Sequence, residues 1–216
     1  MIDTLRHSSL YDPRNYADKR VALIGVGTIG SHLALTLARM QIPFTMYDPD
    51  KIEEHNLATQ AYTRRDIGRY KVDAIKAQCK AIGAEGVEAV RGAFEHDAPY
   101  TATYFLLVSC VDSIDARREI AQELTNHATP DPYRGPIHDG RVGGEQVEVY
   151  RYPNAADWLA GLPEQADTDP CGARFTAYTA NICAGLLANN IKRELLGQPV
   201  TPRILYDAAS SSFLTP

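Results

Sequence analysis

Apolar runs and helical repeats of apolar residues alternate along the first part of the chain. Residues 20–26, "RVALIGV", form a continuous apolar run that leads into glycine, which indicates a strand buried on both faces, as in a parallel sheet. Residues 31–40 place leucines at helical spacing, and residues 43–50 form a second strand that closes in acidic residues. This order predicts a strand–helix–strand unit with a right-handed crossover.

The same alternation continues through the middle of the chain. Residues 64–82 carry apolar side chains on one helical face and charged side chains on the other, which predicts a helix. A short strand, a strongly apolar strand and another helix are expected next, at residues 87–94, 103–112 and 113–128. Strands and helices that alternate in this way predict an α/β fold with a mostly parallel sheet.

The last third of the chain has a different pattern. Residues 135–152 contain a strand, a glycine turn and an alternating strand, which is typical of an antiparallel addition to a parallel sheet. Residues 153–170 are polar and contain prolines, so a loop or crossover is expected there. Residues 174–197 form an alanine-rich helix that stops at glycine, and residues 203–206 suit a final strand. The expected fold is therefore Rossmann-like α/β, with antiparallel strands added in the C-terminal half.

Length and composition fit one domain. Of the 216 residues, 1–19 are polar and are expected to form an N-terminal arm, and 20–216 a single domain. The net charge of −5 argues against nucleic acid as a partner, which would favour a basic face. No apolar run approaches the roughly 20 residues of a membrane span, and the N-terminus lacks the apolar core of a signal peptide. We therefore expect no membrane contact and a cytoplasmic location.

The cysteines give no sign of a zinc site or a disulfide framework. The four cysteines, at positions 79, 110, 171 and 183, contain no CxxC pair. Cys110 ends an apolar strand and Cys183 lies in an apolar helix, so both are expected to be buried.

A glycine-rich turn, "GVGTIG", lies between the first predicted strand and the first predicted helix. In the dinucleotide-binding pattern Gly25 permits the tight turn, Gly27 lets the backbone approach a phosphate, and Gly30 lets the helix pack close to the strand. The helix N-terminus favours an anion, and the hydroxyl of Ser31 adds a donor. An acidic residue at the end of the second strand, Asp48 with Asp50 nearby, would hold the ribose of either NAD or ATP.

Three further motifs identify a family. They are "DPDKIEEHNLATQ" from Asp48, "DIGRYK" from Asp66, and "LLVSCVDSIDARREI", which contains Asp112 and Arg117. Together with the glycine turn and "DGRVGG" from Asp139, they make the chain resemble the ThiF/MoeB/HesA family. These are ATP-dependent activating enzymes for ubiquitin-like and sulfur-carrier proteins. The motifs occur in the family's order, and the resemblance extends over most of the chain.

The resemblance implies adenylation of a carboxyl group, with ATP and Mg²⁺. In the family, a carboxylate attacks the α-phosphate of ATP and pyrophosphate leaves. Lys71 would then contact the phosphates, Asp112 would hold Mg²⁺, and Asp48 would take the ribose. Asn56 and Gln60 would orient the phosphates. The resemblance further implies a homodimer and a small ubiquitin-like or sulfur-carrier protein with a free C-terminus as partner.

The chain departs from the family at one position, because Thr59 precedes Gln60 where the family has arginine. That arginine normally meets the phosphates, and threonine carries no charge. Three explanations stand open. Arg64 or Arg65 supplies the charge from nearby, Arg6 or Arg14 supplies it from the N-terminal arm of a neighbouring subunit, or catalysis is weakened.

Several residues have a second interpretation. Cys171 is a candidate acyl acceptor, because a helix N-terminus and Arg174 would lower the pKa of its thiol, but an ordinary half-buried thiol is equally consistent. Asp112 is a metal ligand or a helix cap, and Arg117 is a site residue or part of a structural ion pair.

Two other functions compete with adenylation. The first is an NAD-dependent oxidoreductase. Lys71 and Asp112 argue against it, because ATP explains these two residues better than NAD does. The second is a non-catalytic nucleotide-binding or dimerisation module of the same fold, which Thr59 favours.

Overall fold

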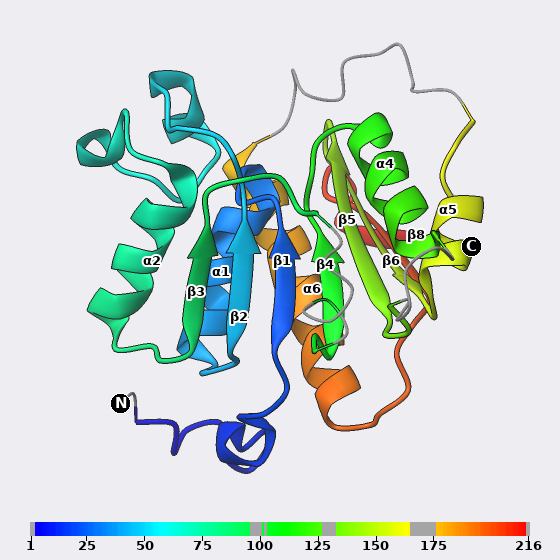
Figure 1. The fold of residues 1–216 in the computed structure, drawn as a ribbon, viewed down its shortest axis with the longest axis horizontal. Coiled ribbons are helices and arrows are strands. Elements are labelled where there is room, and N and C mark those ends of the chain that lie inside the picture. The colour runs from blue at the N-terminus through cyan, green and yellow to red at the C-terminus, as the bar shows by residue number, and fades with distance from the viewer. Residues whose placement is uncertain (1–2, 96–100, 102, 127–132, 165–175, 215–216) are drawn as a thin grey trace.

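A single twisted sheet runs through the protein. In the computed structural model, which describes residues 3–95, 101, 103–126, 133–164 and 176–214, the strand order is β3-β2-β1-β4-β5-β6-β7-β8 (Figure 1). The strands are β1 (Val21–Ile24), β2 (Phe44–Tyr47), β3 (Val87–Val90), β4 (Leu106–Ser109), β5 (Ile137–Gly143), β6 (Gln146–Tyr152), β7 (Arg203–Asp207) and β8 (Ser212–Leu214).

The sheet changes from parallel to antiparallel at β5. Strands β3, β2, β1, β4 and β5 pair in parallel, and β6, β7 and β8 are added antiparallel. The β5–β6 pair is a hairpin whose register places Arg141 opposite Glu148. This arrangement confirms the expected Rossmann-like fold and its antiparallel additions.

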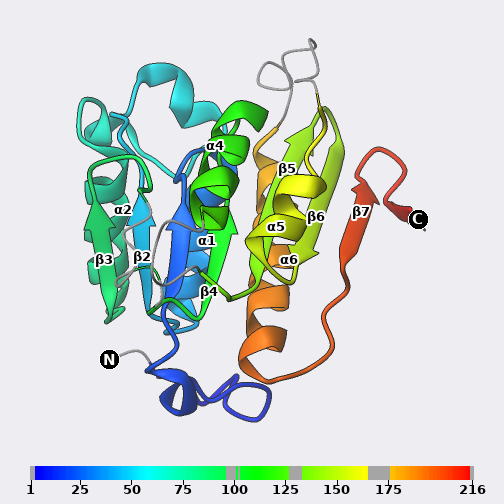
Figure 2. The same ribbon diagram turned by 45° about the vertical axis from the view of Figure 1, so that its right-hand side comes forward.

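Helices cover the sheet on both faces. They are α1 (Thr28–Arg39), α2 (Lys71–Ile82), α4 (Ile114–Thr125), α5 (Ala155–Ala160) and α6 (Ala177–Leu195). Helices α1, α2 and α6 form one layer, and α4 and α5 lie on the opposite face (Figures 1 and 2). Three short 3₁₀ helices complete the described elements: η1 (Pro13–Tyr16), η2 (Glu54–Ala58) and η3 (Arg64–Asp66).

The central strands are buried on both sides, as their continuous apolar sequence predicts. In β1, Val21 and Leu23 belong to the core under α1, α2 and α6, whereas Ala22 and Ile24 belong to the core under α4 and α5. Side chains alternate between the faces of a strand, so a strand covered by helices on both sides must be apolar throughout.

One expected helix begins later in the structure, one expected loop contains a helix, and one strand was not expected. The helix expected over 64–82 begins at Lys71, because Thr63 and Asp66 cap η3 and Gly68 adopts a φ of +85°. The segment 153–170, expected to be a loop or crossover, contains α5. The expected strand at 203–206 is β7, and β8 extends the sheet beyond it.

The structure confirms that the two cysteines expected to be buried are buried. Cys110 and Cys183 lie in the core, and burial raises the pKa of both thiols. Cys171 lies outside the described residues. Among the described helices, none is long and apolar enough to cross a membrane.

Candidate active site

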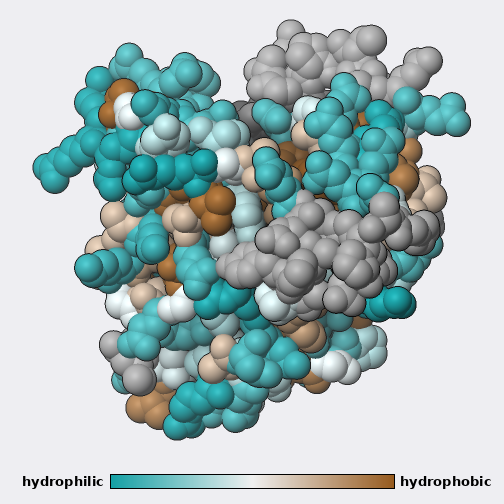
Figure 3. Space-filling model, viewed as in Figure 1, coloured by the Kyte–Doolittle hydropathy of each residue, from teal (hydrophilic) through white to brown (hydrophobic). Residues whose placement is uncertain are grey.

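A cleft of about 920 Å³ opens at the carboxyl ends of the parallel strands. It lies where the strand order reverses between β1 and β4, which is where open α/β sheets bind ligands. In Figure 3 the surface is hollowed between the side of α2 and the side of α4, with apolar residues in the hollow. The lining includes eight of the residues expected from the sequence: Gly25, Gly27, Asp48, Asp50, Asn56, Gln60, Lys71 and Asp112.

The glycine turn has the geometry that close phosphate approach requires. Gly25 has a φ of +85°, and a Cβ there would lie 3.0 Å from the carbonyl oxygen of Cys110. A Cβ on Gly30 would lie 1.9 Å from the carbonyl oxygen of Gly25, so this glycine is what lets α1 pack on the turn. At Gly27 the nearest atom is Gln60 Nε2 at 4.0 Å, so the backbone faces open space.

The N-terminus of α1 is available to an anion. Gly27 is its N-cap and offers no side chain to the first-turn amides, and both Gly27 and Thr28 line the cleft. Unsatisfied amides and the helix dipole attract negative charge. The turn therefore fits a nucleotide phosphate.

Asp48 is buried and held in place by backbone donors. Its carboxylate accepts hydrogen bonds of 2.9 Å from the backbone N–H groups of Val26 and Asp50. Burial raises the pKa of Asp48, an effect that Lys71 and the two N–H groups oppose. The side chain is thus fixed at the end of β2, beside the glycine turn.

Lys71 begins α2 and points into the cleft. Its ammonium lies 2.7 Å from the carboxylate of Asp50 and 4.0 Å from that of Asp48, and its side chain is only 9 % exposed. Because the Asp50 side chain is 62 % exposed, it can move toward solvent when a phosphate takes its place. The ammonium is a point charge of the kind that binds phosphates.

The segment after β2 brings three more residues to the cleft. Asn56 is buried, and its side-chain oxygen accepts the N–H of Glu53 at 2.8 Å as part of a capping box. Gln60 Oε1 is buried and has no hydrogen-bond partner among the described residues. Thr59 lines the cleft, and His32 Nε2 lies 3.0 Å from its carbonyl oxygen. An unpartnered acceptor in a cleft is costly unless a ligand satisfies it.

Asp112 is exposed at the end of β4 and does not cap α4. The cap is Ser113, whose hydroxyl accepts the N–H of Ala116 at 3.0 Å. Within the described part of the chain, the carboxylate of Asp112 makes no hydrogen bond or ion pair, and no cluster of three metal-ligating side chains is found. A hard cation such as Mg²⁺ is commonly bound through one or two carboxylates and substrate phosphates. A carboxylate that lines the same cleft as the glycine turn and has no partner among the described residues fits that pattern.

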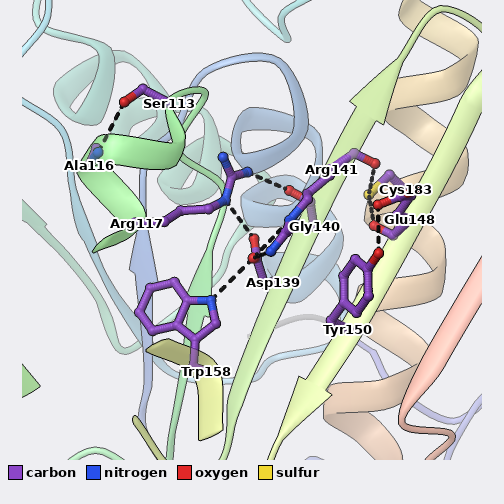
Figure 4. A network of polar contacts seen from close by, with 10 residues as sticks. All are labelled: Ser113, Ala116, Arg117, Asp139, Gly140, Arg141, Glu148, Tyr150, Trp158 and Cys183. Atoms are coloured by element: carbon purple, nitrogen blue, oxygen red, sulfur yellow. Dashed lines mark hydrogen bonds and ion pairs between the residues drawn. The ribbon is translucent and has the colours of Figure 1, made fainter. Parts of the chain in front are cut away.

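A network of buried charges forms part of the wall of the cleft. Arg117 of α4 donates from Nε to Asp139 at 2.9 Å and from Nη2 to the carbonyl oxygen of Gly140 at 3.1 Å. Arg141 donates to the other carboxylate oxygen from Nε at 3.0 Å and Nη2 at 2.7 Å, and Trp158 donates to it at 3.2 Å (Figure 4). The interpretation of Arg117 as part of a structural ion pair is confirmed, although its side chain also lines the cleft.

The sequence did not point to Arg141 as a cleft residue. "DGR" in an expected strand places residues 139 and 141 on one face, because side chains alternate along a strand. That spacing was the available signal. The contact with α4 depends on the tertiary fold.

Three residues that were expected to contact the nucleotide do not line the cleft of the single chain. Ser31 is buried, and its hydroxyl accepts the N–H of Ala61 at 3.0 Å, which fixes the segment over the turn. Arg64 is exposed and pairs with Glu54 at 3.1 Å. Arg14 belongs to η1, a segment that lies at the amino ends of the parallel strands, away from the cleft (Figure 1), and its side chain pairs with a neighbouring aspartate.

Comparison with known proteins gives a consistent family. The family model described as "ThiF family" matches residues 12–213. The chain is 30% identical over 128 residues to "ATP-dependent ubiquitin transferase-like protein Cap2" of Vibrio cholerae, covering 55% of this chain and 22% of that protein. It is 26% identical to "Ubiquitin-like modifier-activating enzyme 5" of Drosophila erecta, covering 96% of this chain and 58% of that protein.

Solved structures share the fold. MccB of E. coli, in a crystal structure with ATP, matches with a TM-score of 0.67 at 16% identity, over 94% of this chain and 65% of that one. PaaA matches with a TM-score of 0.64 at 18% identity, over 94% of this chain and 64% of that one. The chain thus spans less than two thirds of each of these relatives.

Proposed function

We propose that this chain, which belongs to the ThiF family, uses ATP and Mg²⁺ to adenylate a carboxyl group. The expected donor of the carboxyl group is the C-terminus of a ubiquitin-like or sulfur-carrier protein. The observation that carries the proposal is the cleft itself. It brings the glycine turn, Lys71 and the free carboxylate of Asp112 together at one end of the sheet.

Each of these residues would bind a different part of the nucleotide. The glycine turn and the α1 N-terminus receive phosphate oxygens, Lys71 adds a positive charge, and Asp48 takes the ribose. Asn56 and Gln60 orient the phosphates from the segment after β2.

Mg²⁺ would be held by Asp112 and phosphate oxygens, and it would neutralise charge on the leaving pyrophosphate.

The reaction itself needs positioning more than covalent help from the protein. A carboxylate oxygen attacks the α-phosphorus, the bond to the pyrophosphate oxygen breaks, and an acyl-adenylate remains. Fixed cations and backbone donors lower the barrier because they stabilise charge that develops in the transition state. Arg117 and Arg141 line the same cleft as the glycine turn, and the incoming carboxylate would enter beside them.

The names of relatives support a protein or peptide as the acyl donor. Cap2 is named an ATP-dependent ubiquitin transferase-like protein, and the Drosophila relative is named a ubiquitin-like modifier-activating enzyme. MccB structures are described with ATP, AMPCPP and MccA. The homodimer, the acyl transfer to Cys171 and the cytoplasmic location stay predictions.

A second candidate function rests on Thr59, which lines the cleft where the family has arginine. Without that charge, the chain would bind a nucleotide and not turn it over. We place adenylation first because Asp112 has no partner among the described residues and Lys71 lines the cleft.

Pyrophosphate exchange separates these functions. We expect label from pyrophosphate to enter ATP only when Mg²⁺ and a carboxyl donor are present, tested with small proteins and peptides that end in Gly-Gly. Measurable ATP affinity without exchange for any donor would favour the non-catalytic module. Tight NADH binding without ATP binding would favour the oxidoreductase.

A further inference from the structure

The guanidinium charge of the cleft comes from the β5 side. Among the described residues that line the cleft, Arg117 and Arg141 are the arginines, and both contact Asp139. Thr59 lines the same cleft and carries no charge. Arg64 is held by Glu54 outside the cleft.

The two arginines carry more positive charge than the carboxylate of Asp139 can neutralise. The side chain of Asp139 is fully buried, and those of Arg117 and Arg141 are 5 % and 18 % exposed. Both carboxylate oxygens already accept hydrogen bonds from the two arginines and from Trp158. Two guanidiniums on one carboxylate leave a net charge of +1 at the wall of the cleft. Burying a charge without a partner is costly, so this site favours an anion.

Neighbouring groups do not remove the excess charge. Glu148 lies opposite Arg141 in the hairpin, and its carboxylate keeps its negative charge while it accepts the hydroxyl of Tyr150 at 2.8 Å. Arg203, whose Cζ lies 5.3 Å from the centre of the same ring, adds a further guanidinium that offsets the charge of Glu148. The phenol of Tyr152 also faces Arg141, and burial raises the pKa of this phenol, so it stays neutral.

The acidic residues on α4 are solvated. Glu119 and Glu123 line the cleft but are exposed, and no ion pair joins either of them to the two arginines within the described part of the chain. These two carboxylates therefore do not neutralise the charge of Arg117 and Arg141.

Arg141 is held in place on the wall of the cleft by contacts on several sides of its guanidinium. Its hydrogen bonds to Asp139 use Nε and Nη2, and its Cζ lies 4.7 Å from the centre of the Tyr150 ring (Figure 4). These contacts fix the plane of the guanidinium. The hydrogen bonds to Asp139 do not use Nη1, and the phenol of Tyr152 is a further hydrogen-bond partner of the guanidinium. A side chain fixed before binding loses little entropy when a ligand arrives.

We infer that Arg141 binds an oxyanion of the reaction, a phosphate or a carboxylate oxygen, and supplies from β5 the charge that Thr59 does not. The inference rests on the proposed function for its ligands, ATP and the acyl donor. Arg141 would then touch the reacting groups directly, with Asp139 and Tyr150 as positioning residues.

Binding measurements with two anionic probes test this inference without requiring turnover. The wild-type chain, Arg141→Gln, Arg141→Lys and Arg203→Gln are titrated with inorganic pyrophosphate, and with a peptide ending in Gly-Gly as free acid and as C-terminal amide. We expect Arg141→Gln to weaken pyrophosphate or the free acid about tenfold or more, the scale of a lost charge-assisted hydrogen bond. Arg203→Gln, which touches the same Tyr150 ring but does not line the cleft, should change either affinity less than about threefold.

The outcomes separate the ligands and the two proposals. Loss of pyrophosphate affinity assigns Arg141 to a phosphate, and loss of the free acid alone assigns it to the carboxylate. Equal affinities of Arg141→Gln and wild type for both probes, or no wild-type affinity for either, overturn the inference. Arg141-dependent binding in a chain that never exchanges pyrophosphate overturns the proposed function and leaves this inference standing.

A measurement on the wild-type chain covers the case in which Arg141→Gln does not fold. The arginine Nε–H resonance that is missing from Arg141→Lys belongs to Arg141. Its NMR shift should move and saturate as either probe is added, and an unchanged resonance contradicts the inference.

The relation to residue 59 has its own test. Adding Thr59→Arg to Arg141→Gln should restore pyrophosphate affinity at least tenfold if the two positions serve the same anion. Affinity that stays at the level of Arg141→Gln shows that Arg141 does not take over the role of that arginine.

Discussion

At the scale of single residues, Asp112 and Lys71 reach the same cleft in different states. Asp112 is exposed and free of partners in the described structure, whereas the ammonium of Lys71 is buried between two carboxylates. A free carboxylate at the carboxyl end of a strand contributes little to folding. Removal of the Lys71 ammonium leaves the buried carboxylate of Asp48 without its cation, which costs stability, so variants at the two positions should behave differently.

Asp112→Asn should abolish Mg²⁺-dependent pyrophosphate exchange while the melting temperature stays within a few degrees of wild type. The amide keeps the shape of the side chain but loses the charge that a hard cation needs. Asp115→Asn is the matched control, because Asp115 is an exposed carboxylate three residues further on that pairs with Arg118. Undiminished exchange in Asp112→Asn rules out the metal role.

Lys71→Met should lower exchange by about 100-fold or more, the scale expected for the loss of one electrostatic donor at a transition state. It also leaves buried Asp48 without its cation, so some loss of stability is expected and is measured by urea unfolding. Lys76→Met, an exposed position on the same helix, serves as control. Exchange at the wild-type rate in Lys71→Met would make Lys71 a structural residue only.

At the scale of elements, the β1–α1 turn and the start of α2 set the shape of the cleft. Local sequence predicts β1, α1 and β2 well, because their apolar spacing and the glycine turn agree with one another. The start of α2 is less predictable, since the helical pattern extends back through Ile67. The Thr63–Asp66 cap and the positive φ of Gly68 end that pattern.

Helix α5 could not be predicted from the pattern of residues 153–170. It is only six residues long, follows a proline, and depends on the burial of Trp158 against the sheet. Its N-cap, Asn154, accepts the N–H of Asp157 at 2.9 Å, but such a cap is common in loops as well. Tertiary packing decides this element, and it positions the indole that binds Asp139.

Gly30→Ala should destabilise the protein by roughly 1–3 kcal/mol or more, the usual range for overpacking. The added Cβ would lie 1.9 Å from a backbone carbonyl oxygen, so α1 must move away from the turn. Gly185→Ala is the control, because this glycine lies in α6 with nothing within 4 Å of the added Cβ. That change should be neutral or slightly stabilising. Equal urea midpoints for the two variants would contradict the packing described for the turn.

At the scale of the whole molecule, three polar side chains, His138 of β5, Arg151 of β6 and Glu194 of α6, connect these elements. His138 Nε2 lies 3.5 Å from Glu194, which also accepts from Arg151 at 2.8 Å. Burial lowers the pKa of His138, opposed by Glu194. Burial alone would raise the pKa of Glu194, but His138 and Arg151 outweigh it and lower that pKa. Both groups therefore take up protons more readily in the unfolded chain.

The free energy of unfolding should fall as the pH drops below about 6.5, the ordinary pKa of histidine, and fall further below about 4.5. The sign follows because the unfolded state binds more protons in these windows. The slope from one group is at most about 1.4 kcal/mol per pH unit. Urea unfolding between pH 8 and 5 measures it, and His138→Gln should flatten the part near pH 6. A stability that rises on acidification contradicts the burial of a neutral His138.

The overall fold and much of the cleft could be predicted from sequence, because apolar runs set the strands and local motifs set the turn. The wall formed by Arg117, Asp139 and Arg141 could not, since it joins α4 and β5 through contacts that no local pattern encodes. The place of Arg14 illustrates the same limit. It belongs to η1, at the amino ends of the parallel strands (Figure 1), so a role in the cleft depends on a second subunit.

The transfer of an oxygen atom from the carboxyl donor to AMP tests the proposed chemistry most directly. A peptide ending in Gly-Gly, labelled with ¹⁸O in its terminal carboxylate, is incubated with the chain, ATP, Mg²⁺ and hydroxylamine, which attacks the acyl carbon. We expect AMP that carries one ¹⁸O, because the carboxylate oxygen that attacked the α-phosphorus stays with the phosphate. AMP or ADP without the label would show that water, and not a carboxylate, attacks ATP, and would contradict carboxyl adenylation.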